Sequence, residues 1–400
     1  MKKTLLAAAL MAGFAGVAQA ETSVTLYGIL DGGIGYEQLK GKASYLENRT
    51  GVQDFKSTRT GLINGVQFGN RWGLKGSEDL GNGLRAVFVL ESGFDLATGN
   101  QAQGGRLFGR QATMGLASDS WGQLDIGRQT NIASKYLPGV VSPFGASFGQ
   151  ANAGAVFSQA NTARYDNMIM YQTPNFSGFQ FGVGYSFNIN GSQSSKWDET
   201  GTLVDGLERN TRAFTTGIRY SSGPIAAALT YDTYTSPETR AVVGGPVSGD
   251  VNVHAWALGA SYDFEVVKVY LGGGQTRNGM FANQGYLGDT AFNNNSVAGS
   301  FRAADGLKVN SYSVGLSAPL AGGTIMASWM MADPTDGPDA WNAVGQPART
   351  MEKQNTYSLG YTYNLSKRTS MYAFGSYADN VYFLPEAKST IVGLGLVHKF

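Results

Sequence analysis

The sequence contains no cysteine, only two histidines and few charged residues. Without cysteine there is no disulfide, no thiolate zinc site and no cysteine nucleophile. Charged residues make up 15% of the 400-residue chain, against about 25% in ordinary soluble domains. The 30 basic and 29 acidic residues leave a formal charge of +1, whereas nucleic-acid-binding domains are strongly basic. A soluble helical enzyme and a nucleic-acid partner are both disfavoured.

Long apolar runs are also missing from residue 21 onwards. The longest strictly apolar runs there are five residues, Ala86–Leu90 and Ile225–Leu229, and a membrane helix needs about 20. The sequence therefore predicts no helical membrane span in this part of the chain.

The first twenty residues have the pattern of a secretory signal. Lys2 and Lys3 form a charged start, Leu5–Val17 is apolar, and Ala18-Gln19-Ala20 has the small-x-small form that signal peptidase cuts. We expect residues 1–20 to be removed as a signal peptide and residues 21–400 to be the mature protein.

Apolar residues recur at every second position along the chain, which is the period of a strand with one apolar face. From Phe179 to Phe187 the odd positions are all apolar, and Gln, Gly and Ser lie between them. The stretches 214–220, 357–363 and 392–396 alternate in the same way. Aromatic residues gather at the strand ends, as in the girdles of a transmembrane β-barrel. They include Tyr185, Phe187, Tyr220, Tyr231, Tyr262, Phe264, Tyr361 and Tyr363.

Short and long connections alternate along the chain. The short ones are hairpin turns rich in Gly, Pro, Asn and Ser, at 79–83, 119–122, 174–178, 221–224, 319–323 and 364–368. The long ones lie near 40–59, 129–163, 188–210, 235–250, 277–308 and 333–353. Tight periplasmic turns and longer outer loops give a transmembrane barrel this pattern.

Sixteen segments with this alternation can be counted. They begin near Ser23, Leu62, Leu84, Arg106, Gln123, Met168, Phe179, Ala213, Ile225, Val253, Val267, Val309, Thr324, Thr356, Thr369 and Ser389. The fold class expected is all-β: a 16-stranded antiparallel up-and-down transmembrane β-barrel. Lipid requires the sheet to close, so the first strand should pair with the strand that ends at Phe400. At this strand number the lumen holds water.

Several segments resemble the general diffusion porins of Gram-negative outer membranes, especially the trimeric type of β-proteobacteria. The matching stretches span the chain: 24–31 (VTLYGILD), 71–84 (RWGLKGSEDLGNGL), 90–94 (LESGF), 108–112 (FGRQA), 127–129 (GRQ), 367–369 (KRT) and 398–400 (HKF). The resemblance implies passive diffusion of small hydrophilic solutes and ions, a homotrimer in the cell outer membrane, and no cofactor. It implies that the family's third long loop, which the resemblance assigns to Gln129–Ala163, folds into the barrel as a constriction.

The same resemblance implies further partners. Outer-membrane lipid and lipopolysaccharide would surround the barrel. The outer-membrane assembly machinery would recognise the terminal Phe400.

The expected constriction is basic. No Asp or Glu occurs from Ile126 to Tyr165, whereas many related porins carry carboxylates on this loop. If Trp72 and Leu74 face lipid, Arg71 and Lys75 point into the lumen. The candidate pore residues are Arg71, Lys75, Arg110, Arg128, Lys135 and Arg164. Basic side chains at a narrow point favour anions, so we expect an anion preference.

Strand parity conflicts with two of these candidates. Arg110 shares its parity with the apolar positions of its strand, and so does Arg128. Either a β-bulge intervenes or these arginines are solvated rim charges, and Arg128 could instead contact a neighbouring subunit.

Other functions find weaker support. A substrate-selective channel needs an aromatic track, for which Tyr136, Phe144 and Phe148 are the only hint. Residues 145–149 match G-x-S-x-G but lack the strand and helix that this nucleophile motif requires. Asp333, Asp336 and Asp339 could bind calcium. Pro334 and Pro338 interrupt the ligand pattern of a calcium-binding loop, which argues against such a site. We expect neither catalytic nor metal-binding residues. A further alternative is a secreted soluble β-sandwich or propeller. Such a protein would dissolve without detergent, unlike a membrane barrel.

Overall fold

The computed structural model describes residues 23–42, 54–193, 210–236, 239–240, 247–248, 250–281, 301–339 and 350–400. The expected signal peptide lies outside these residues. Strands dominate, and none of the helices described is long and apolar enough to cross a membrane.

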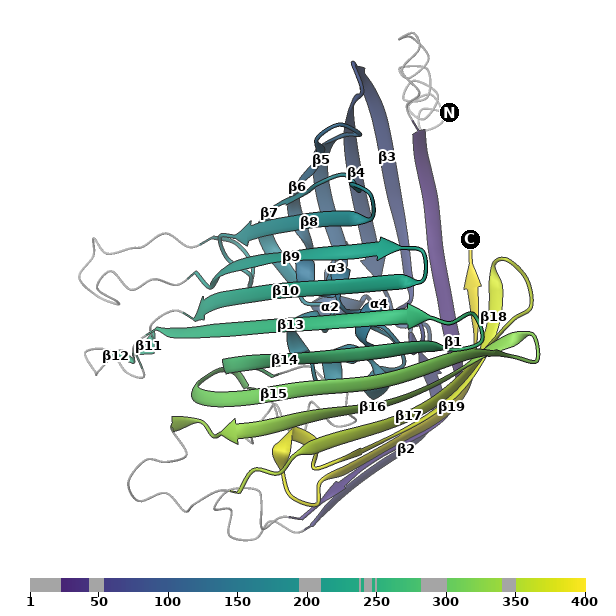
Figure 1. Ribbon diagram of the computed structural model, residues 1–400, viewed down its shortest axis with the longest axis vertical. Helices are drawn as coiled ribbons and strands as arrows, with labels where there is room; N and C mark the ends of the chain where they lie inside the picture. Colours follow the sequence, from purple (N-terminus) through teal and green to yellow (C-terminus); the bar gives the residue numbers. More distant parts are fainter. Residues whose placement is uncertain are drawn as a thin grey trace, which may run out of the picture.

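One antiparallel sheet forms the body of the protein. Its strands are β1 (Ser23–Gly41), β2 (Phe55–Asn64), β3 (Arg71–Gly81), β4 (Leu84–Gly93), β5 (Gln111–Ser118), β6 (Gly122–Thr130), β7 (Arg164–Gln172), β8 (Phe179–Ser186), β9 (Arg212–Ser222), β10 (Ile225–Ser236), β13 (Val251–Asp263), β14 (Lys268–Phe281), β15 (Phe301–Leu320), β16 (Gly323–Asp336), β17 (Gln354–Asn364), β18 (Thr369–Asp379) and β19 (Lys388–Lys399). Figure 1 shows β8 to β16 side by side in chain order. A separate two-stranded ladder joins β11 (Thr239–Arg240) and β12 (Val247–Ser248).

The sheet closes between its first and last strands. β1 pairs with β19 from Ile29 opposite Lys399 to Lys40 opposite Lys388. The terminal residue extends the closure, because Gly28 and Phe400 exchange both backbone hydrogen bonds, at 3.0 and 3.1 Å. The expected closure by the C-terminal strand is confirmed.

β2 and β3 are two parts of one strand. Both pair with β1, β2 through residues 32–41 and β3 through residues 23–29. Counting them as one strand turns the 17 segments of the sheet into 17 − 1 = 16 strands, which confirms the barrel expected from the sequence. The second strand begins at Phe55 rather than near Leu62, and the fourth at Gln111 rather than near Arg106.

The break between β2 and β3 is held by a buried carboxylate. Asp31 accepts hydrogen bonds from the backbone N–H groups of Gln67 and Phe68, both at 2.7 Å, and from the hydroxyl of Tyr372 at 2.8 Å. Since buried polar groups are costly unless paired, these bonds fix the chain where the ladder is interrupted.

Apolar side chains cover the outside of the barrel. Phe181 is 43% exposed and Leu359 57% exposed, whereas the alternating Gly182 and Ser358 are buried. This is the inverse of a soluble protein, in which such residues form the core. The alternation read from the sequence thus places the apolar face outward, as a barrel in lipid requires.

The segment between β6 and β7 lies against the inner wall. It contains α3 (Ile132–Tyr136), α4 (Pro138–Val141), η2 (Gly149–Ala151), η3 (Ala153–Ala155) and η4 (Ser158–Ala160). Its backbone carbonyls accept hydrogen bonds from wall side chains far away in sequence. Ser313 donates to Val141 O at 3.0 Å and Ser311 to Val156 O at 2.7 Å.

Inward-facing glycines make room for this segment. A Cβ at Gly182 would lie 2.5 Å from Ile132, and one at Gly272 would lie 2.8 Å from Val141. Gly217, Gly259, Gly315 and Gly360 face the same segment just as closely. These glycines leave space on the wall for residues 131–163 to pack, which explains part of the high glycine content.

Barrel closure makes Gly33 sensitive to substitution. A Cβ there would overlap the backbone of Leu394 and Gly395 in β19. We expect Gly33→Val to destabilise the barrel by about 3 kcal/mol or to prevent closure, because overpacking against backbone cannot be relieved by a rotamer change. Urea titration of the refolded protein in detergent measures this, with Gly273→Val as the control, because the nearest atom to its Cβ is 4.0 Å away. Equal stability of the two variants would contradict the close approach of β19 to Gly33.

Candidate functional site

Glu91 of β4 is the centre of the first group of charged side chains. Its carboxylate accepts from Arg110 Nε at 2.6 Å and from the Tyr27 hydroxyl at 2.9 Å. Arg71, the first residue of β3, lies 3.7 Å away. The side chains of Arg110 and Glu91 are only 11% and 13% exposed. One carboxylate therefore orients two arginines on the inner wall.

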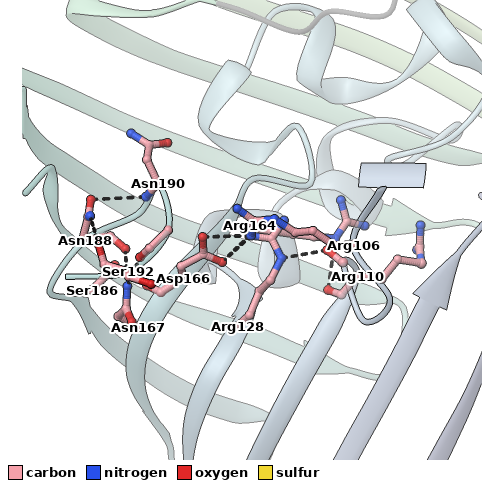
Figure 2. A network of polar contacts seen from close by, with 12 residues as sticks. Arg106, Arg110, Arg128, Arg164, Asp166, Asn167, Ser186, Asn188, Asn190 and Ser192 are labelled. Atoms are coloured by element: carbon pink, nitrogen blue, oxygen red, sulfur yellow. Dashed lines mark hydrogen bonds and ion pairs between the residues drawn. The ribbon is translucent and has the colours of Figure 1, made fainter. Parts of the chain in front are cut away.

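Asp166 of β7 is the centre of the second group. It pairs with Arg128 at 2.5 Å and, through both oxygens, with Arg106 at 2.8 and 2.9 Å. The aspartate is itself fixed, because Ser186 Oγ donates to its backbone carbonyl at 2.6 Å. Figure 2 shows Arg106, Arg128 and Arg164 gathered beside this carboxylate.

Arg164 lies between the two groups and contacts no carboxylate among the described residues. Its Nε donates to the carbonyl of Arg110 at 3.1 Å and its Nη1 to the carbonyl of Thr162 at 3.2 Å. Backbone carbonyls hold the guanidinium in place but do not neutralise it. Its positive charge therefore adds to that of the two groups without a carboxylate of its own among the described residues.

Two local irregularities lie next to Arg110 and Arg128. Arg110 precedes β5, so the alternation of that strand does not apply to it. In the β6–β7 ladder the register shifts between Gly127 and Gln129, where Gly127 has a φ of 121°. The extra residue lies on β7, where three steps from Met168 to Tyr165 oppose two steps of β6, and Arg128 Nε donates to Gly109 O at 2.8 Å. Arg110 and Arg128 are held by Glu91 and Asp166, and their orientation toward the lumen stays a prediction.

The two groups together carry an excess of positive charge. Five arginines (Arg71, Arg106, Arg110, Arg128 and Arg164) face two carboxylates (Glu91 and Asp166), a balance of 5 − 2 = +3. Arg106, Arg128 and Arg164 line a cavity of about 930 Å³ together with Asn161 and Asn190. This space is polar and large enough for hydrated small ions.

Lys75 and Lys135 lie apart from this cluster. Lys75 is exposed on β3, with its Nζ 5.5 Å from the ring of Tyr27. Lys135 on α3 instead interacts with Asp125 and Arg219. Burial lowers the pKa of the Lys135 ammonium, Asp125 opposes this shift, and Arg219 adds to it. The next residue, Tyr136, has its pKa raised to about 12 by burial, and its hydroxyl donates to Gln172 at 3.2 Å.

The remaining candidates have structural contacts. The ring of Phe400 lies over Gly28, which has no side chain to obstruct it. Phe144 and Phe148 are buried, and Phe148 packs edge-on against Phe144 and Tyr372 at 5.5 Å. Within the described residues no cluster of His, Asp and Glu could hold a metal ion.

Sequence reasoning missed Arg106 and Asp166. Asp166 is the first acid after the acid-free stretch Ile126–Tyr165, so the boundary of that stretch was a usable signal. Arg106 precedes β5 in an irregular connection that includes α2 (Ala102–Gly105), where no periodicity indicates its direction.

Comparisons with known proteins agree on one family. A family model described as Gram-negative porin matches residues 7–381. An outer membrane porin protein of Bordetella pertussis is 54% identical, over 100% of both chains. Outer membrane porin protein 32 of Delftia acidovorans is 30% identical over 98% of this chain and 92% of its own. The solved anion-selective porin from Comamonas acidovorans has 26% identity and a TM-score of 0.66, covering 95% of this chain and 100% of its own.

The Glu91 group should matter for stability. Glu91→Gln would leave Arg71 and Arg110 without their carboxylate in a mostly buried setting. We expect a loss of about 2–4 kcal/mol in the free energy of unfolding, somewhat less than for a fully buried pair.

Urea titration in detergent checks this, with Asp119→Asn as the matched control. Asp119 pairs with Arg85 at 2.8 Å but is 90% exposed, and exposed pairs contribute at most about 1 kcal/mol. A loss no greater than that of the control would show that Glu91 does not organise the wall.

Proposed function

Because the chain belongs to the Gram-negative porin family, we propose that its arginine cluster makes the barrel an anion-preferring channel. The protein is an outer-membrane porin, not an enzyme, and its barrel is a water-filled path for passive diffusion of small hydrophilic solutes and ions. The observation that carries the anion preference is the +3 balance of five arginines against two carboxylates. The name of the anion-selective Comamonas porin agrees with it.

The charge acts where the lumen is narrowed. Residues 131–163 occupy the inner face of the wall and carry no acid, so they add no negative charge opposite the arginines. A low-dielectric wall around a narrow aqueous path concentrates the field of fixed charges. Local charge at this cross-section, rather than the near-zero charge of the whole chain, therefore sets ion preference.

A substrate-selective channel finds little support in the placement of the aromatic residues. Phe144 and Phe148 pack into the wall beside Tyr372 and Phe374. Tyr136 is 3% exposed. None of these rings presents a face along which a solute could slide.

The proposal extends to assembly and export. We infer a homotrimer in outer-membrane lipid and lipopolysaccharide, cleavage after Ala20, and recognition of Phe400 by the outer-membrane assembly machinery. A solved Vibrio cholerae OmpT is described as a trimer form, and the 46% exposed Phe400 ring is accessible at the barrel rim. The intact mass of the protein purified from membranes tests the cleavage site.

Two substitutions in the arginine cluster and its carboxylates should change ion preference in opposite directions. Arg164→Gln removes a positive charge, whereas Asp166→Asn removes a negative one two residues away. We expect the chloride-to-potassium permeability ratio to fall about two- to fivefold in the first and to rise by a similar factor in the second, because one unit charge at 4 Å in water contributes about 1 kcal/mol.

Reversal potentials across a planar bilayer with unequal KCl on its two sides measure these ratios. The wild type should prefer chloride. A clear preference of the wild type for potassium would refute the proposed selectivity, and shifts of the same sign in both variants would refute the charge mechanism.

A further inference from the structure

A second pair of cations lies where α3 of the inner segment packs against β9. Lys135 projects from α3, and Arg219 lies on β9 three residues before its end at Ser222. Neighbouring positions Ile218 and Tyr220 share the outward face of β9, so Arg219 points inward. Arg219 acts electrostatically on Lys135, and it stacks on the ring of the next residue, Tyr136.

Arg219 is held in a fixed orientation by its neighbours. Its guanidinium carbon lies 4.7 Å from the centre of the Tyr136 ring, and its Nε donates to Gln180 Oε1 at 2.9 Å. Tyr136 is in turn tied to Gln172 at 3.2 Å. Stacking on an aromatic face and one hydrogen bond to a neutral amide orient the guanidinium without neutralising its charge. Its terminal nitrogens remain able to bind an oxyanion in a bidentate manner.

One carboxylate lies near this pair, and both of its oxygens accept hydrogen bonds from another side chain. Asp125 of β6 accepts from Gln123 Nε2 with both oxygens at 2.9 Å. In the part of the chain that the structure describes, neither Lys135 nor Arg219 forms an ion pair with a carboxylate. The local balance is therefore 2 − 1 = +1.

The pair is separate from the arginine cluster along the pore. Asp125 and Arg128 lie on the same strand, three residues apart, which corresponds to about 10 Å along the strand. The residues around this pair lie near the short turns. Within three residues of a strand end that meets such a turn are Asp125, Gln180 and Arg219. In transmembrane barrels of this kind the short turns are periplasmic.

We propose that Lys135 and Arg219, with the amides of Gln172 and Gln180, form a second binding station for small oxyanions on the periplasmic side of the constriction. Carboxylate and phosphate groups both present two oxygens to a guanidinium, and phosphate has a further oxygen for the ammonium. An anion that leaves the arginine cluster would meet this station before the short-turn end of the barrel. The inference rests on the proposed anion channel, but its residues are different.

Inhibition of chloride current by inorganic phosphate tests the station. The double variant Lys135→Met, Arg219→Gln should require about fivefold more phosphate for the same inhibition of KCl conductance in a planar bilayer, as expected from the loss of close charges in an aqueous lumen. The chloride-to-potassium permeability ratio should stay above one, because the arginine cluster is intact. The conservative pair Lys135→Arg, Arg219→Lys should recover most of the inhibition.

Arg85→Gln is the matched control. Arg85 lies on β4 one residue from the same end of the barrel but is paired with Asp119 at 2.8 Å, so its removal should leave phosphate inhibition unchanged. Unchanged inhibition in the double variant, with chloride still preferred, would overturn the station and leave the proposed function standing. A potassium preference of the wild type would overturn both.

Discussion

The requirement that every main-chain polar group find a partner within the sheet governs this structure. In lipid an open strand edge leaves N–H and C=O groups unpaired, and the pairing of β1 with β19 removes that edge. Closure then determines which face of each strand contacts the aqueous lumen and which contacts lipid. Phe181 and Leu359 face outward, while small residues such as Gly182 and Gly272 face inward and leave space for residues 131–163.

The charged wall follows from that narrowed interior. Glu91 and Asp166 each orient two arginines, so most of the guanidinium groups are held by carboxylates yet outnumber them. Arg164 between them is bound only through backbone carbonyls. Two acids thus serve to position the arginines, and the surplus charge remains for solutes. In the function proposed, the contacts that stabilise the wall also set the ion preference.

The period of two made the barrel, its strand number and its closure predictable, because alternation is a property of regular strands. It could not place Arg110 and Arg128, since Arg110 precedes its strand and Arg128 lies opposite a register shift of β7. Nor could it separate Lys135 from the arginines, because the direction of a short helix inside a loop depends on packing against distant strands. Arg106 and Asp166 pair across sixty residues, a contact that no local pattern encodes.

The orientation of neighbouring side chains in a bilayer tests the account most directly. The chain has no cysteine, so Gln180→Cys and Phe181→Cys each accept a single spin label. The account predicts that the label at 181 collides with lipid-dissolved oxygen and the label at 180 with a water-soluble nickel complex. Equal exposure of both labels to the nickel complex, or the reverse assignment, would contradict an apolar exterior around an aqueous lumen.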